Sequence, residues 1–246
     1  MIHGIHQIQG LDAMQRQDRE QLSDRIIRKA LSLGASLAGT AAIRSIQCTP
    51  SHRSAGDLKW PEGARSAVIL ALHHPRKEPS LDWWDQRAGK TPGNRKLTRI
   101  VGALGEWLKG ELAVTAFAVP YWVEDGGIFL KEAGVSAGLG VIGRNNLLIT
   151  PRFGPRVRLR ALLVDVDLQD GGGLEFDPCG ACPAPCRQAC PEQAFGSGSY
   201  ERSRCRRQLE KDQRNPYRIL DIGSMTYSIE CIKYCRACEL ACPVAG

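Results

Sequence analysis

The sequence predicts an α/β domain followed by a smaller, cysteine-rich domain. Helical and strand patterns alternate through the first two thirds of the chain, which is typical of α/β domains. Nine of the ten cysteines fall between Cys179 and Cys242, and the three consecutive glycines Gly171–Gly173 separate the two parts. We therefore expect a first domain over residues 1–172 and a second domain over residues 173–246.

Three segments of the first domain have the spacing of apolar residues that amphipathic helices show. Residues 15–33 combine one apolar stripe with a charged face, and Gly34 is expected to end this helix. Residues 97–112 repeat apolar side chains every three or four positions, and residues 128–137 form a shorter segment. These segments supply the helical half of the α/β pattern.

Four segments are expected to be strands. Ser66–Leu72 is a short apolar run bounded by proline and glycine, which suits a central strand. Residues 114–123, 146–150 and 157–166 read as further strands. The segment 77–95 is rich in proline, glycine and charged residues, so we expect a surface loop there.

The cysteines form two runs that each end in Cys-Pro. The runs are Cys179-x2-Cys182-x3-Cys186-x3-Cys190-Pro191 and Cys235-x2-Cys238-x3-Cys242-Pro243. This spacing is typical of proteins with two [4Fe–4S] clusters, in which the last cysteine of one run binds the other cluster. The runs supply seven thiolates, and by spacing alone the eighth is Cys205 or Cys231. The second domain is therefore expected to transfer electrons.

Zinc and disulfides are the alternatives for these cysteines. Two Cys-x2-Cys pairs would satisfy a zinc ion and would leave Cys186, Cys190 and Cys242 without a purpose. Disulfide frameworks belong to short secreted chains, and residues 1–19 contain no apolar signal segment. Since no run of about 18 apolar residues exists either, we expect a cytoplasmic protein that does not enter a membrane.

The formal net charge of the 246-residue chain is +7, and such a basic chain is compatible with a nucleic-acid partner. That value counts every cysteine as neutral. Eight ligating thiolates around two cluster cores would remove about four charges. The charge therefore says little about partners.

A group of three glycines and a pair of acidic residues each allow both a structural and a functional interpretation. Gly138, Gly140 and Gly143 match the spacing of a dinucleotide-binding loop, but they follow a helix and precede a strand, the reverse of that motif. They are expected to mark a tight turn or a close approach of the backbone to another group. Glu124 and Asp125 follow a predicted strand, and they suit either an acidic turn or a functional site.

The chain resembles the epoxyqueuosine reductase family and the related corrinoid reductive dehalogenases. The resemblance rests on Tyr121-Trp-Val-Glu-Asp-Gly-Gly and Ala137-Gly-Leu-Gly-Val-Ile-Gly-Arg-Asn-Asn, joined to the two cysteine runs. It extends over nearly the whole chain. In the family, a C-terminal helical-repeat domain helps to hold tRNA. This sequence contains no counterpart of that domain before Gly246, so we expect tRNA to be a less favoured partner.

The resemblance implies a nitroreductase-like α/β domain that binds cobalamin in its base-off form, followed by a ferredoxin-like domain with two [4Fe–4S] clusters. It implies Cys179, Cys182, Cys186 and Cys242 as ligands of one cluster. It implies Cys190, Cys205, Cys235 and Cys238 as ligands of the other, and so favours Cys205 over Cys231.

The resemblance also implies residues that contact cobalamin or donate a proton. The cobalamin-binding residues are expected to be Gly138, Gly140, Ile142, Gly143, Arg144, Asn145, Phe153 and Arg156. The place of the family's general-acid aspartate is held by Glu124, with Asp125 beside it, and Tyr121 is a second candidate. A carboxylic acid can take this role if burial raises its pKa toward the working pH.

The implied function is that of a cobalamin-dependent iron–sulfur reductase, an oxidoreductase. Its expected partners are an electron donor of the flavodoxin or ferredoxin type and a small-molecule or nucleoside-like substrate. The alternative is an electron-transfer protein that reduces the corrinoid of a partner and has no substrate of its own.

Overall fold

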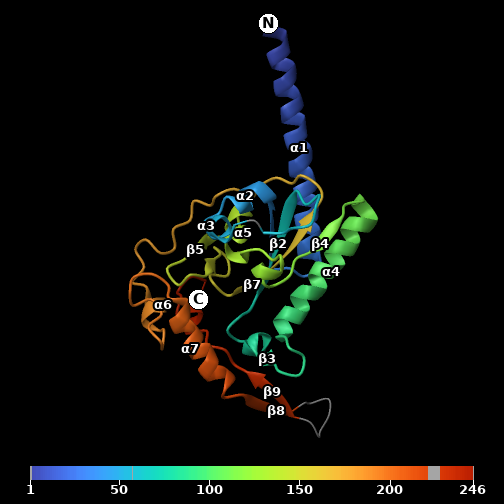
Figure 1. Cartoon of the computed structure of the whole chain (residues 1–246). Helices are drawn as coiled ribbons and strands as arrows, with labels where there is room; N and C mark the ends of the chain where they lie inside the picture. The colour runs from blue at the N-terminus through green and yellow to red at the C-terminus, as the bar shows by residue number, and fades with distance from the viewer. Residues whose placement is uncertain (1, 57, 221–227, 246) are drawn as a thin grey trace. The chain divides into compact units, whose positions relative to one another are not determined.

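The structure is a computed structural model that describes residues 2–56, 58–220 and 228–245 (Figure 1). Its α-helices are α1 (Ile2–Ser32), α2 (Ile43–Gln47), α3 (Pro50–Ala55), α4 (Pro92–Leu112), α5 (Leu130–Ser136), α6 (Pro185–Gln188), α7 (Arg202–Gln213) and α8 (Ala237–Leu240). Its strands are β1 (Leu37–Ala42), β2 (Ser66–His73), β3 (Trp84–Asp85), β4 (Ala116–Ala118), β5 (Val141–Ile142), β6 (Leu148–Ile149), β7 (Val157–Val164), β8 (Tyr217–Leu220) and β9 (Ser228–Ile232). Two 3₁₀ turns, η1 (Pro79–Asp82) and η2 (Val123–Asp125), complete the set in the described residues.

The chain divides into two compact units. The first unit contains Met1–Ala71, Arg99–Leu139 and Leu159–Leu174. The second unit contains Leu72–Thr98, Gly140–Arg158 and Glu175–Gly246. The second unit is thus built from three separate stretches of chain, and the division into domains at residue 172 stays a prediction.

The first unit is built on a four-stranded sheet with the strand order β1-β2-β7-β4. β1 and β2 pair antiparallel with Leu37 opposite Ala71, and β4 and β7 pair antiparallel with Ala116 opposite Val164. The central position of β2 explains its sequence, because every residue from Ser66 to Leu72 is buried.

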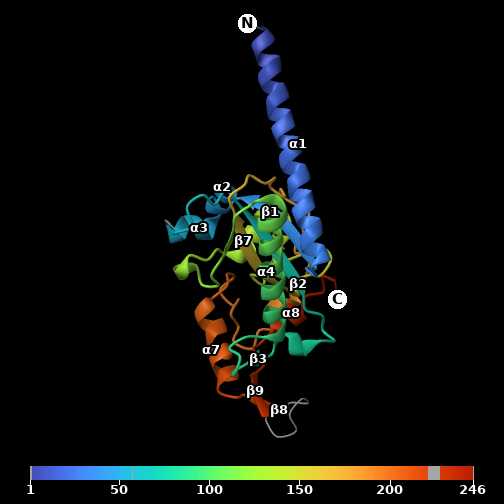
Figure 2. The same cartoon turned by 90° about the vertical axis from the view of Figure 1, so that its right-hand side faces the viewer.

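Helices cover this sheet on both sides (Figures 1 and 2). On one side, α1 packs beside α4, and the charged groups of Arg25 and Lys29 lie over the ring of Trp107 at 5.5 and 5.6 Å. The short helices α2, α3 and α5 lie on the other side (Figure 1). α1 ends where the sequence predicted, because Gly34 adopts a positive φ of 103°.

The second unit contains short strands and short helices. β5 and β6 form an antiparallel hairpin, and β9 lies between β3 and β8. The helices α6, α7 and α8 carry three of the cysteines, Cys186 and Cys238 from the two runs and Cys205 from outside them. This unit therefore brings most of the cysteines together.

The predicted α/β fold is confirmed, with corrections to individual elements. The strand expected at 114–123 is limited to β4, because the chain turns at Pro120 and forms η2. The loop expected at 77–95 contains η1, β3 and the start of α4. No helix in the described residues is long and apolar enough to cross a membrane.

Candidate metal centres

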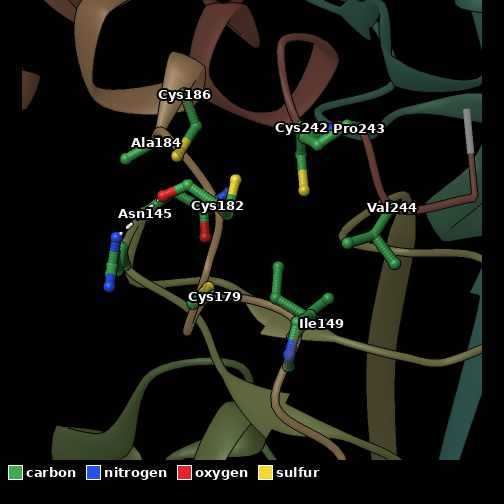
Figure 3. A pocket seen from close by; sticks show the side chains of 11 residues that line it. Asn145, Ile149, Cys179, Cys182, Ala184, Cys186, Cys242, Pro243 and Val244 are labelled. Atoms are coloured by element: carbon green, nitrogen blue, oxygen red, sulfur yellow. Dashed lines mark hydrogen bonds between the residues drawn. The ribbon is translucent and has the colours of Figure 1, made fainter.

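Four cysteines from both runs line one cavity, which we call site 1. They are Cys179, Cys182, Cys186 and Cys242. Figure 3 shows these four side chains around a common space, with Ile149 and Val244 as apolar neighbours. Three of these cysteines lie in α6 or in the loop before it, and the fourth follows α8. The chain therefore folds back on itself to bring residues about sixty positions apart to one place.

The loop of site 1 is held by hydrogen bonds to its backbone. The carboxylate of Asp177 accepts hydrogen bonds from the N–H groups of Cys179 and Gly180 at 3.2 and 2.9 Å. The guanidinium of Arg144 donates to the carbonyl oxygen of Cys182 at 2.9 Å. These contacts fix the direction of the backbone between the first two cysteines of the run.

Two buried side chains border the same site. Asn145, which lines the cavity, donates from its amide to the carbonyl of Cys238 at 3.4 Å. Arg156 is 2% exposed and donates to the carbonyl of Val244 at 3.2 Å. Its Nη1 atom has no hydrogen-bond partner within the described part of the chain. The positive charge of Arg156 acts on Cys242 and partly offsets the burial that raises the pKa of that thiol.

Four other cysteines form a second group, which we call site 2. Its members are Cys190, Cys205, Cys235 and Cys238. Burial, together with the charges of the other three thiols, raises the pKa of Cys238 to about 12. Burial, together with the neighbouring thiol of Cys205, raises the pKa of Tyr200.

The backbone of site 2 is tied to α7. Besides supplying Cys205, this helix carries Asp212, whose carboxylate accepts a hydrogen bond from the N–H of Cys235 at 2.7 Å. The sulfur of Cys190 accepts a hydrogen bond from the N–H of Ala194 at 3.3 Å. Helix α7 thus positions two of the four cysteines, and the sequence patterns gave no sign of it.

Cys231 lies outside both groups. It is buried on β9, opposite Tyr217 on β8 and Asp85 on β3. Burial raises the pKa of its thiol, and the charges that act on it belong to Asp85, Arg95 and Lys233. The grouping of the thiols thus favours Cys205 over Cys231 as the eighth ligand, which stays a prediction.

The arrangement of the thiols is compatible with iron–sulfur clusters. Burial raises the pKa of Cys186, Cys235 and Cys242 as well as that of Cys238, so free thiols would keep their protons at neutral pH. Iron displaces such protons, because a coordinating thiol is deprotonated outright. In the described residues, no three His, Cys, Asp or Glu side chains are arranged to hold a single metal ion.

A buried network of charged residues supports the segment that joins the two sites. Asp82 contacts His74 at 2.8 Å and Arg158 at 2.7 Å, and Arg158 also pairs with Glu239 at 2.9 Å. Arg236 pairs with both acids. Burial alone would raise the pKa of Asp82, but the hydrogen bond from His74 and the charges of the two arginines lower it. Arg236 and Glu239 flank Cys238, so the network fixes the segment that contributes cysteines to both sites.

The three glycines of the predicted cobalamin-binding group pack against the protein's own backbone. A Cβ atom on Gly140 would lie 2.2 Å from the carbonyl oxygen of Ile149, because β5 and β6 pair there. A Cβ on Gly138, whose φ is 71°, would lie 2.7 Å from the carbonyl oxygen of Gly171. A Cβ on Gly143 would lie 2.6 Å from the side chain of Ile149. Close packing within the protein therefore explains why glycine occupies each of these three positions, and no ligand is needed to explain it.

The remaining residues of that group have varied surroundings within the second unit. Arg144, Asn145 and Arg156 contact the backbone near the cysteine sites, as described above. The ring of Phe153 stacks on His73 with centroids 4.4 Å apart, and Ile142 is exposed. Contact of any of these residues with cobalamin stays a prediction.

The predicted proton donors lie in the first unit around η2. Glu124 and Asp125 are exposed, and so is Tyr121, whose ring lies 4.8 Å from the guanidinium carbon of Arg160. Two side chains fix the segment that follows the carboxylates. Trp60 donates to the carbonyl of Gly127 at 3.1 Å, and His52 accepts a hydrogen bond from the N–H of Phe129 at 3.1 Å. The sequence patterns did not single out these two anchors.

Comparisons with known proteins find two groups of relatives, while no family model matches. The chain is 32% identical over 137 residues to an epoxyqueuosine reductase from Synechocystis sp., and this match covers 54% of the chain and 46% of the relative. It is 43% identical over 74 residues to a tetrachloroethene reductive dehalogenase from Desulfitobacterium hafniense, covering 29% of the chain and 13% of the relative. The chain spans about half the length of the epoxyqueuosine reductases that it matches.

Solved structures of both groups have the same type of fold. An epoxyqueuosine reductase crystallised with a tRNA stem loop matches with a TM-score of 0.61 at 18% identity, over 92% of this chain and 65% of that chain. A catabolic reductive dehalogenase in complex with 3-bromo-4-hydroxybenzoic acid matches with a TM-score of 0.55 at 18% identity, over 72% of this chain and 26% of that chain. The resemblance expected from the sequence is confirmed: the chain is similar to epoxyqueuosine reductases and to reductive dehalogenases, and it has their type of fold.

Proposed function

We propose that the protein is a cobalamin-dependent iron–sulfur reductase of the epoxyqueuosine reductase type. The observation that carries this proposal is the grouping of eight cysteines into two sets of four within one unit. The similarity to epoxyqueuosine reductases and reductive dehalogenases supports it.

Each set of thiols would hold one [4Fe–4S] cluster. Site 1 offers a cavity bordered by apolar side chains, and site 2 offers thiols whose backbone is fixed by α7. When bound, the clusters and a base-off cobalamin would supply one-electron transfers and a reactive cobalt. The chain's own contribution is to hold the clusters, to keep water from site 1 and to set the charge around each cluster.

A proton for the substrate would come from Glu124, Asp125 or Tyr121. All three are exposed in the first unit, and the bonds from Trp60 and His52 hold the segment that follows the carboxylates. A carboxylic acid in this position can protonate a substrate once the substrate excludes water from it. The donor group would therefore be completed only when the substrate binds.

The proposed substrate class is based on molecules bound in two solved relatives. One solved epoxyqueuosine reductase holds a tRNA stem loop modified with epoxyqueuosine, and one dehalogenase holds a brominated hydroxybenzoic acid. We propose a nucleoside-like substrate, in tRNA or as a small molecule. Release of halide from a halogenated aromatic acid, without reduction of the stem loop, would favour that acid as the substrate instead.

Cofactor content after anaerobic purification and reconstitution tests the proposal. We expect about eight iron atoms and about one cobalt per chain, a visible spectrum of base-off cobalamin, and reduction of an epoxyqueuosine-containing stem loop by a low-potential donor. Eight iron atoms without retained cobalt would contradict the cobalamin part. A protein without iron would contradict the whole proposal.

A second candidate function is favoured by the exposure of both carboxylates. An electron-transfer protein that reduces a partner's corrinoid needs no proton donor, and exposed acids at a turn are then ordinary surface residues. The double substitution Glu124→Gln and Asp125→Asn separates the two functions. A reductase would lose turnover, whereas an electron carrier would keep its rate of corrinoid reduction. The exposed pair Glu20→Gln and Asp24→Asn on α1 serves as the control.

A further inference from the structure

The outer face of α7 is strongly basic. Between Arg202 and Arg214 the chain has six basic residues and only two acidic ones. Five of the basic side chains are exposed, and we call them the α7 basic face: Arg202, Arg206, Arg207, Lys211 and Arg214. Their spacing places Arg206, Arg207, Lys211 and Arg214 on the outward half of the helix.

The stability of the fold does not explain this concentration of charge. No residue of α7 is fully buried, so the helix contributes little to a hydrophobic core. Like charges that are four residues apart, such as Arg202 and Arg206, destabilise a helix. The excess positive charge therefore destabilises α7 without contributing to packing. Such a combination is typical of functional surfaces.

Acidic neighbours compensate only part of the charge. Arg207 and Lys211 share the single carboxylate of Glu192, and Arg206 pairs with Glu210 at 3.0 Å. Within the described residues, Arg202 and Arg214 form no ion pair. The face thus keeps a net positive charge that is available to a partner.

The same helix is part of site 2. Cys205 belongs to the inner side of α7, and Asp212, also on the inner side, holds the N–H of Cys235. Tyr200, which is 36% exposed, lies just before the helix, and the thiol of Cys205 is close enough to raise its pKa. A helix with its side chains is about 10–12 Å across, so a molecule on the outer face would lie about one helix diameter from a ligand of site 2.

We propose that the α7 basic face docks an acidic one-electron carrier of the flavodoxin type, and that electrons enter the protein at site 2. This inference rests on the proposed function, since it requires a cluster at site 2. In each transfer the anionic flavin hydroquinone gives one electron and becomes the neutral semiquinone. The cluster accepts that electron and changes from the 2+ to the 1+ state, so no proton has to move.

The position of the basic face favours an electron carrier over a nucleic acid. Both partners are acidic, and charge alone would suit either. Only an electron carrier gains from docking on the helix that supplies Cys205, because the transfer requires proximity to the cluster. Electron-transfer encounters are also small and guided by charge, which one helix face can provide.

Rapid mixing with a reduced flavodoxin tests the proposal. The reconstituted protein would be mixed anaerobically with a purified acidic flavodoxin in its hydroquinone form, and the second-order rate of cluster reduction followed by absorbance at several salt concentrations. We expect Arg206→Glu with Arg214→Glu to lower the low-salt rate at least about tenfold and to remove its fall with added salt.

The matched control is Arg16→Glu with Arg28→Glu on α1. It makes the same change of charge at two exposed helical positions, and Arg28 pairs with Asp24 at spacing i,i+4 as Arg206 pairs with Glu210. The control should leave the rate unchanged. Photoreduction followed by a count of electron-paramagnetic-resonance spins shows whether each variant keeps its clusters. If the glutamate variant loses them, Arg206→Gln with Arg214→Gln takes its place.

An unchanged reduction rate in an α7 variant with intact clusters would overturn the proposal. If the same variant also bound a tRNA stem loop more weakly, as measured by fluorescence anisotropy, the face would be assigned to nucleic acid. Neither finding bears on whether the clusters are present. Either result leaves the proposed function standing, whereas a wild-type protein without iron would contradict the proposed function itself.

Discussion

Sites 1 and 2 offer the same number of thiols but differ in the groups around them. Site 1 is bordered by the buried guanidinium of Arg156, whose charge acts on Cys242. At site 2 the carboxylate of Asp212 accepts a hydrogen bond from the N–H of Cys235, and Tyr200 is a neighbour of Cys205. Nearby charge and hydrogen bonds to sulfur set the potential of an iron–sulfur cluster.

This difference implies a direction for electrons. A reduced cluster carries one more negative charge, so a buried cation raises its reduction potential and a nearby carboxylate lowers it. We expect the cluster at site 1 to be the easier one to reduce. Electrons received at site 2 would then pass to site 1, which agrees with docking of the donor on α7.

The largest expected effect separates Cys205 from Cys231. Cys205→Ser should remove the cluster of site 2 and with it about four of the eight iron atoms, because Cys205 groups with the thiols of that site. Cys231→Ser should leave the iron content unchanged, since this thiol lies on β9 among charged residues. Iron and sulfide analysis after anaerobic reconstitution measures both. Loss of iron in Cys231→Ser alone would reverse the assignment.

The second expected effect concerns the buried charges beside the segment that both sites share. Asp82→Asn should lower the free energy of unfolding by about 3–5 kcal/mol, because Arg158 and Arg236 would lose a buried partner. Asp167→Asn, which breaks an exposed pair with Arg65, should cost at most about 1 kcal/mol. Anaerobic urea denaturation of the holoprotein compares them, and equal losses would contradict the role of the network.

The lowered pKa of Asp82 also gives a dependence on pH. A carboxyl group with a folded-state pKa below its unfolded value contributes stability above the unfolded pKa, near 4, and loses it as the pH falls through the folded value. The difference in stability between the wild type and Asp82→Asn should therefore be full at pH 6 and shrink below about pH 4.

A smaller effect is expected at site 1. Arg156→Gln should lower the potential of that cluster by about 60 mV, a tenfold change in a one-electron equilibrium, because it removes the buried charge beside Cys242. Redox titration monitored by electron paramagnetic resonance measures this shift. Arg152→Gln, an exposed change four residues away, is the control and should leave the potential in place. If the potential of site 2 shifted instead, the charge of Arg156 would act on site 2 and not on site 1, which would contradict the prediction.

The smallest effect is expected at site 2. Tyr200→Phe removes the hydroxyl beside Cys205, and a hydrogen bond from that hydroxyl to the sulfur of a bound cluster ligand would be worth about 0.5–1.5 kcal/mol. We therefore expect the potential of that cluster to fall by about 20–60 mV in the same titration. Tyr217→Phe, which alters an exposed tyrosine on β8, should have no effect. If both variants behave alike, the hydrogen bond does not tune the cluster.

Much of the fold could be predicted because the signals are local. The apolar stripe of residues 97–112 and the buried run Ser66–Leu72 each contain the pattern of the element that forms. Strands such as β8 and β9 were missed, since they are short and lack clear alternation. The strand expected at 114–123 was too long, because apolar and aromatic residues continue past the turn at Pro120.

The sequence by itself determined seven of the eight cysteines of the candidate sites. The spacing of the cysteine runs is a local property, and it predicts two sets of ligands before any folding is known. The tertiary structure decided which other residues surround those sets. Asp82, Arg158 and Arg236 are separated by more than seventy residues along the chain, yet they share one buried network. A buried charge is tolerated only beside its partner, and such partners are brought together by the fold rather than by spacing in the sequence.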